Sequence, residues 1–104
     1  MNVLFHPEAR EELRQAAEWY EDRRSGLGDE LLAAVERAVE VVREAPDRWP
    51  VYPTGERSRR FLLRRFPFSV NYVVRGDMLF IAAVAHLSRR PGYWGQRLTQ
   101  RAGR

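Results

Sequence analysis

The residues whose side chains could do chemistry gather near the end of the chain. His86 can act as an acid or a base, because an imidazole gains or loses a proton near neutral pH. Arg89 and Arg90 follow it, and guanidinium groups bind phosphate or carboxylate through paired hydrogen bonds. Tyr93 adds an aromatic ring that can stack on a base. These residues predict an anion-binding site, while the alternative for His86 is a structural hydrogen bond at a strand end.

The net charge is divided unevenly along the chain. Residues 1–56 hold thirteen of the fourteen acidic residues and seven of the eighteen arginines, a net charge of about −6. Residues 57–104 hold eleven arginines and one acidic residue, Asp77, a net charge of about +10. Phenylalanine, tyrosine and tryptophan are interleaved with these arginines. We expect such a segment to bind an anionic partner, either nucleic acid or an acidic protein segment.

The composition excludes several kinds of site. The 104 residues include no cysteine, which excludes disulfides and thiolate metal sites, and the only histidines are His6 and His86. We therefore expect neither a metal nor a cofactor. The longest apolar stretch, residues 78–85, is too short to cross a bilayer, and the N-terminus lacks a signal-peptide pattern. The expectation is one domain over residues 1–104, in the cytoplasm and without membrane contact.

The first half of the chain has the periodicity of helices. After a short apolar run at residues 3–5, apolar side chains recur at helical spacing over 7–20 and again over 29–42. Pro7 suits a first helical turn, and Asp29 is predicted to cap the second helix. Because only about five residues join the two helices, they should form an antiparallel hairpin.

The second half has the periodicity of strands. The prolines of residues 46–57 predict a rigid loop, and strands are predicted at 61–63, 68–75 and 78–85, the last covered on both faces and 68–75 half-exposed. A short terminal helix should begin at Pro91. The predicted fold class is α+β in the order β-α-α-β-β-β-(α), a helical hairpin packed on a small, mostly antiparallel sheet.

Several short motifs follow one another along the chain. They are Phe5-His6-Pro7-Glu8-Ala9 with Glu12-Leu13, Trp19-Tyr20, Gly26-Leu27-Gly28, Ala45-Pro46, Arg64-Arg65-Phe66-Pro67-Phe68 leading into Tyr72, and His86 through Arg89-Arg90-Pro91 to Tyr93-Trp94 and Arg97. In this order and spacing, over residues 3–98, they resemble the RelE/ParE superfamily of toxins from bacterial type II toxin–antitoxin systems. The resemblance implies a small basic α+β protein that is held inactive by the tail of a cognate antitoxin. It also implies that operator DNA is bound only through the antitoxin complex.

The superfamily contains two kinds of toxin, and the resemblance allows both. RelE-type members cut mRNA in the ribosomal A site, whereas ParE-type members poison DNA gyrase. In RelE-type sites basic residues on the strands surround the scissile phosphate. Here Arg60 and Tyr93 match that pattern, but Leu62, Ser69 and Leu87 stand at the other basic positions. This comparison favours the ParE-like branch.

The resemblance therefore yields ranked predictions. The first is a toxin that binds a large target, DNA gyrase, and whose target- or antitoxin-binding residues are Arg60, Arg64, Arg65, Arg89, Arg90, Tyr93, Trp94 and Arg97. The second is a ribosome-dependent, metal-independent endoribonuclease whose catalytic residues would be His86, Arg89, Arg90 and Tyr93. The third is an inactive homologue that only binds an antitoxin.

Overall fold

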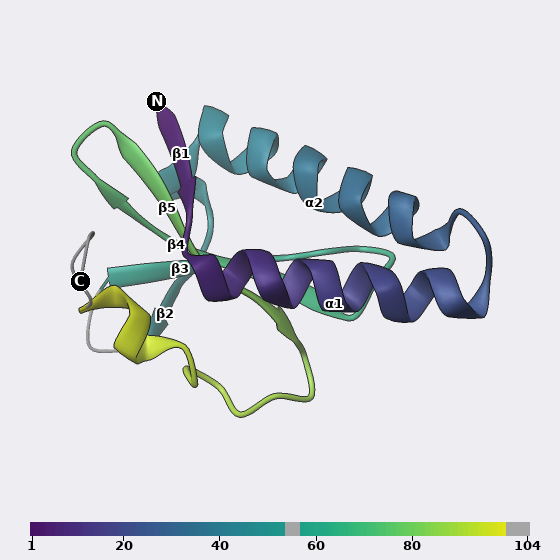
Figure 1. Cartoon of the computed structure of the whole chain (residues 1–104). Helices are drawn as coiled ribbons and strands as arrows, with labels where there is room; N and C mark the ends of the chain where they lie inside the picture. Colours follow the sequence, from purple (N-terminus) through teal and green to yellow (C-terminus); the bar gives the residue numbers. More distant parts are fainter. Residues whose placement is uncertain (54–56, 100–104) are drawn as a thin grey trace.

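The computed structural model describes residues 1–53 and 57–99, and Figure 1 shows the path of the chain. The helices of these residues are α1 (Pro7–Arg23), α2 (Leu27–Glu44) and the short 3-10 helices η1 (Pro46–Arg48) and η2 (Gly95–Leu98). The strands are β1 (Asn2–Phe5), β2 (Val51–Pro53), β3 (Arg57–Leu62), β4 (Phe68–Arg75) and β5 (Met78–His86). The predicted α+β class is confirmed. Of the predicted loop at 46–57, residues 54–56 lie outside the described residues.

The first helix begins where the sequence predicts. Pro7 occupies the first turn, and the Nδ1 atom of His6 accepts a hydrogen bond from the backbone N–H of Glu8 at 3.0 Å. Pro7 suits this position because the first helical N–H groups have no partner inside the helix. His6 is thus a buried capping residue of α1.

The second helix begins earlier than predicted, and Asp29 does not cap it. Its N-cap is Gly26, which has a φ of 89° and no side chain. The carboxylate of Glu21 accepts hydrogen bonds from the backbone N–H groups of Gly26 and Gly28, at 3.0–3.1 Å and 3.0 Å. The capping prediction failed because the acceptor comes from the preceding helix, where short-range patterns give no signal for it.

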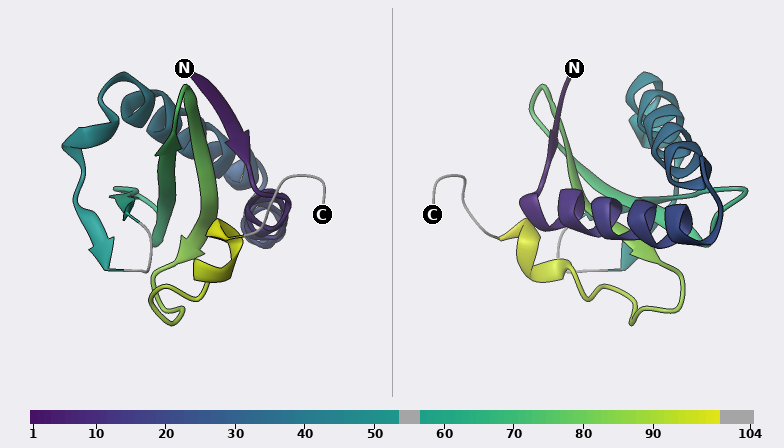
Figure 2. Two further views of the ribbon diagram at one scale, coloured as in Figure 1. Left: turned by 90° about the vertical axis from the view of Figure 1, so that its left-hand side faces the viewer. Right: turned by 45° about the vertical axis from the view of Figure 1, so that its right-hand side comes forward.

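The strands form one sheet in the order β1-β5-β4-β3-β2, seen from two sides in Figure 2. β1 runs parallel to β5, and the other neighbouring pairs are antiparallel. The predicted edge strand at 3–5 and the interior strand at 78–85 are confirmed. β2 was missed, because Pro50 before it and Pro53 at its end are typical of a loop, and a proline-rich segment pairs only at a sheet edge.

Both faces of the sheet are covered, each by a different part of the chain. The hairpin of α1 and α2 packs on one face, over Val70, Tyr72 and Ile81. The segment after β5 packs on the other face, where Trp94 and Leu98 meet Val73, Phe80 and the alanines of β5. β4 is therefore buried on both faces, and the prediction that it is half-exposed was wrong. Ser69 and Asn71 looked solvent-facing but hydrogen-bond each other under this cover, at 3.0 Å.

The C-terminal segment differs from the expected helix. Residues 91–94 form turns, and only Gly95–Leu98 is helical, as a 3-10 turn. The side chain of Trp94, which is 2% exposed, and that of Leu98 anchor this segment to the sheet. No helix within residues 1–53 and 57–99 is long and apolar enough to cross a membrane.

Candidate functional site

The site begins at a bulge in β5. The register of β4 and β5 shifts between Asn71 and Tyr72, which pair with Ala83 and Ile81 and leave Ala82 as an extra residue. β1 pairs with β5 only as far as Ile81. Beyond that point no strand of the described chain pairs with this side of β5, so its backbone N–H and C=O groups need side-chain partners.

Glu12 of α1 and Arg97 of η2 supply these partners. The Oε1 atom of Glu12 accepts the backbone N–H of Val84 at 3.1 Å. The Nη1 atom of Arg97 donates to the carbonyl oxygen of Ala82 at 3.1 Å. The two side chains therefore replace the missing strand, one as acceptor and the other as donor.

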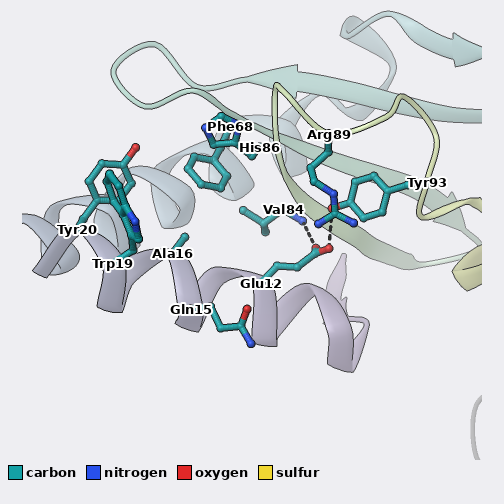
Figure 3. A pocket seen from close by; sticks show the side chains of 10 residues that line it. All are labelled: Glu12, Gln15, Ala16, Trp19, Tyr20, Phe68, Val84, His86, Arg89 and Tyr93. Atoms are coloured by element: carbon teal, nitrogen blue, oxygen red, sulfur yellow. Dashed lines mark hydrogen bonds between the residues drawn. The ribbon is translucent and has the colours of Figure 1, made fainter. Parts of the chain in front are cut away.

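Glu12 also binds the C-terminal segment directly. Its carboxylate accepts hydrogen bonds from Arg97 at 3.0 and 2.9 Å, a two-pronged ion pair, and from the hydroxyl of Tyr93 at 2.6 Å (Figure 3 shows the bonds to Val84 and Tyr93). The carboxylate thus joins α1, β5 and the segment that follows β5. Such paired, charge-assisted bonds hold geometry closely.

The network raises the pKa values of Tyr93 and Arg97. Burial and the nearby Glu12 carboxylate raise the pKa of Tyr93 above its usual range. Burial favours the neutral form of Arg97, but the hydrogen bonds and charge of Glu12 outweigh it and raise the pKa of Arg97. Tyr93 therefore stays a hydrogen-bond donor and Arg97 stays a cation throughout the physiological range.

A cleft of about 430 Å³ lies between α1 and the end of β5. Figure 3 shows Trp19 and Tyr20 at one end of it, and Glu12, Arg89 and Tyr93 at the other. The Arg89 guanidinium carbon lies 3.9 Å from the centre of the Tyr93 ring, a cation–π contact. Arg89 is exposed, so its charge remains accessible to a partner.

A second, smaller hollow of about 50 Å³ borders the loop of residues 87–94 between β5 and η2, called the Tyr93 loop below. Its lining includes Arg60, Arg90, Asn71 and Trp94. The guanidinium of Arg60 lies 4.8 Å from the ring centre of Tyr52. The structure thus brings Arg60, Arg89 and Arg90 together around one hollow.

Other predicted site residues lie elsewhere. Arg64 and Arg65 stand in the bend between β3 and β4, and Arg65 forms an ion pair with Glu30 of α2. Arg97 is 9% exposed and is bound to Glu12, while Trp94 is buried. The basic half of the chain therefore does not form one continuous arginine surface, because acidic residues of the first half neutralise part of it.

His86 lies where the exposed end of β5 meets the cleft. Its Nδ1 atom accepts the backbone N–H of Ser88 at 3.0 Å, and its ring packs edge-on against Phe68 with 5.1 Å between centres. The structural hydrogen bond considered for His86 is present. The catalytic assignment of His86, Arg89, Arg90 and Tyr93 stays a prediction.

Comparison with known proteins shows the family to which the chain belongs. Residues 3–91 match the model of the family described as ParE toxin of type II toxin-antitoxin system, parDE. A solved structure described as the chromosomal ParDE TA system from P. aeruginosa is similar, with a TM-score of 0.61 and 22% sequence identity over 83% of this chain and 95% of that chain. At this identity the structural likeness shows the fold alone. No curated protein matches. The family model covers most of the chain, and the chain belongs to the ParE toxin family.

Proposed function

We propose that this protein is the toxin of a type II toxin–antitoxin pair, that it inhibits growth in the cytoplasm by binding DNA gyrase, and that a cognate antitoxin neutralises it. The observation that carries the proposal is the cluster of Arg60, Arg89 and Arg90 around the Tyr93 loop. None of the three forms an ion pair within residues 1–53 and 57–99, whereas Arg65 and Arg97 do. Arg89 and Arg90 are exposed and Arg60 is half-buried, and arginines without an ion pair are what a protein interface with an acidic partner uses.

Two features support binding over RNA cleavage. Ser69 and Asn71 on the wall of the hollow beside Arg60 bond to each other and add no cation to hold a phosphate. The Tyr93 hydroxyl donates to a carboxylate, and general acid–base work on a phosphodiester would require it to leave that partner.

Rigid anchoring of the loop also supports the proposal. The loop that carries Arg89 and Arg90 leaves β5 at His86. Its other end is anchored because Trp94 and Leu98 pack into the core and Tyr93 and Arg97 bind Glu12. A preorganised loop loses little conformational entropy on binding. The network is thus the support of the binding surface, and the exposed arginines are the surface itself.

The test is inducible expression of the chain alone in a bacterial host, with growth, DNA-break signalling and mRNA integrity followed together. We expect growth arrest with DNA breaks and intact mRNA. The variant with Arg60, Arg89 and Arg90 changed to glutamine should lose toxicity while keeping its unfolding midpoint, and Arg37→Gln on α2 is the control for the loss of an exposed arginine outside this cluster. Cleavage of mRNA within minutes without DNA breaks would make the protein a nuclease, and normal growth would make it an inactive antitoxin-binding homologue.

A further inference from the structure

Two leucines are exposed beside the arginine cluster of the proposed target surface. Leu62 is the last residue of β3 and is 48% exposed. Leu87 is the first residue of the Tyr93 loop and is 49% exposed. Single exposed leucines are ordinary on protein surfaces, so two of them indicate a binding surface only where they share a face with other binding residues.

The strand pairing places both leucines on one face of the sheet. Leu62 pairs with Ser69 of β4, and Ser69 pairs with Ala85 of β5, so these side chains lie on the same side. The backbone N–H of Leu87 donates to the carbonyl oxygen of Pro67 at 2.9 Å, which extends the contact of β5 with β4 past the end of the strand. Leu87 lines the same hollow as Ser69 and Ala85. The two leucines therefore flank the buried Ser69 on the face that carries this hollow.

Three arginines border these leucines. Arg60 lies two residues before Leu62 on β3, so the two side chains share a face. The hollow that Leu87 lines is also lined by Arg60, Arg89 and Arg90, and within the described chain its lining contains no acidic residue. An apolar patch with a positive border is complementary to a partner that presents an apolar side chain between carboxylates.

We infer that Leu62 and Leu87 are the apolar centre of the target-binding surface, and that Arg60, Arg89 and Arg90 are its charged border. The occupant is a protein segment that places an apolar side chain against the leucines and carboxylates against the arginines. That this segment belongs to the target of the toxin rests on the proposed function. An apolar centre inside a polar rim is the general arrangement of protein–protein interfaces.

The apolar centre favours a protein over a nucleic acid. A leucine side chain has no donor for a phosphate oxygen, and it gains free energy only when apolar atoms of a partner remove it from water. Single-stranded nucleic acid would instead use free ring faces for base stacking. Here Trp94 is 2% exposed, and guanidinium carbons lie 4.8 and 3.9 Å from the ring centres of Tyr52 and Tyr93.

Changing the leucines to arginine separates the two kinds of partner, because the change has opposite effects on them. A charge placed in an apolar contact weakens the binding of a protein, whereas an added cation strengthens the binding of a phosphate chain. The variants are Leu62→Arg and Leu87→Arg. Leu4→Arg is the matched control, since Leu4 is 44% exposed on the edge strand β1 and does not line the hollow. All three leucines are exposed, so each variant should keep its unfolding midpoint, and Leu87→Ala provides a milder change.

The probes are purified DNA gyrase and dodecauridylate RNA, and the affinity of the full chain for each is measured by titration. We expect both leucine-to-arginine variants of the surface to bind gyrase more than about tenfold more weakly than the wild type. Leu87→Ala should bind roughly three- to tenfold more weakly, as expected when part of a leucine side chain loses its apolar contact. Leu4→Arg should stay within about twofold of the wild type. Growth arrest in cells should weaken in the same order.

The possible outcomes separate this surface from the proposed target. Unchanged gyrase binding in the folded variants Leu62→Arg and Leu87→Arg would overturn the apolar centre and leave gyrase as the target. Tighter RNA binding together with faster growth arrest in these variants would also overturn it, in favour of a phosphate-binding surface. A wild-type chain that arrests growth without binding gyrase would overturn the proposed target alone. In that case loss of arrest in both variants, with intact mRNA in the wild type, would support the same surface for another protein target, and persistent arrest would overturn it.

Discussion

Glu12 and Arg97 lie 85 residues apart in the sequence and form two hydrogen bonds, at 3.0 and 2.9 Å. Through this pair the first helix holds the segment that follows the last strand. The same two side chains complete the backbone hydrogen bonding of β5 at Val84 and Ala82, where β1 has ended. The stability of the sheet edge and the position of the Tyr93 loop therefore depend on one carboxylate.

The first prediction concerns that carboxylate. Glu12→Gln keeps the side-chain shape but leaves the buried Arg97 with only the more distant carboxylate of Glu8, at 3.7 Å, as a counter-charge. We expect the free energy of unfolding to fall by about 1.5–3 kcal/mol, the range for hydrogen bonds to charged groups. Chemical denaturation measures this change. Glu11→Gln, one residue earlier, removes an exposed ion pair with Arg14 and should lower the free energy of unfolding by much less.

A double-mutant cycle measures the interaction energy between Glu12 and Arg97 separately from the cost of changing each side chain. Arg97→Met removes the charge and keeps much of the volume, so its cost should be smaller in the Glu12→Gln background than in the wild type by at least about 1 kcal/mol. Additive costs would show that the two residues stabilise the fold independently and would contradict the joint role assigned to them here.

The second prediction concerns alkaline pH. Burial raises the pKa of Tyr72 to about 12, and the pKa of Tyr93 is raised further. The folded state therefore holds these protons more tightly than the unfolded state, whose tyrosines titrate near pH 10. The resulting stability is fully present below about pH 10 and is lost as the pH rises toward 12. The free energy of unfolding of the wild type should therefore fall between about pH 9 and about pH 11. This fall should be smaller in the double variant Tyr72→Phe/Tyr93→Phe, which lacks both hydroxyls.

The third prediction concerns the turn between the helices. A Cβ atom at Gly28 would lie 2.6 Å from the backbone carbonyl oxygen of Ala17, so Gly28→Ala should cost about 1–3 kcal/mol through overpacking. Gly26→Ala should cost about 1–2 kcal/mol, because its φ of 89° strains any side chain. Gly95, which has open space around it, is the control and should change by less than about 0.5 kcal/mol. Equal costs at all three positions would refute the steric argument.

The fourth prediction separates two basic regions. Arg64 and Arg65 stand at the bend beside α2, away from the Tyr93 loop, and we propose that they contact the antitoxin. The double variant Arg64→Gln/Arg65→Gln should stay toxic but require more antitoxin for neutralisation. Co-expression with the antitoxin under a titratable promoter measures this. Loss of toxicity in a folded variant would place these arginines in the target surface instead.

Local patterns predicted α1, most of α2 and the positions of β1, β4 and β5, because the periodicity of these elements is set by which side chains are buried. They failed at β2, where prolines conceal a short edge pairing. They failed again at β4, whose second face is covered by a segment that begins 16 residues after the strand ends, at Pro91. The periodicity within a strand does not show whether a segment later in the chain packs on its second face.

Of the candidate site, the sequence indicated the arginines but not the carboxylate that supports them. Arg89, Arg90 and Arg60 were named from residue type and from the family resemblance, and in the structure all three line one hollow. Glu12 was missed, because a glutamate on a helix with several others is ordinarily a solvated charge. Its partners Arg97 and Tyr93 were predicted to bind a target or an antitoxin. The sequence does not show that their polar groups bind Glu12 of the first helix.

The most direct test of the central claim is a supercoiling assay with purified DNA gyrase, relaxed plasmid and this protein. The account predicts that the wild-type chain blocks supercoiling and leaves broken plasmid in the presence of ATP. The variant with Arg60, Arg89 and Arg90 changed to glutamine should not, and Arg37→Gln should match the wild type. Undisturbed supercoiling at concentrations of the wild-type chain that arrest growth would contradict the assignment of gyrase as the target.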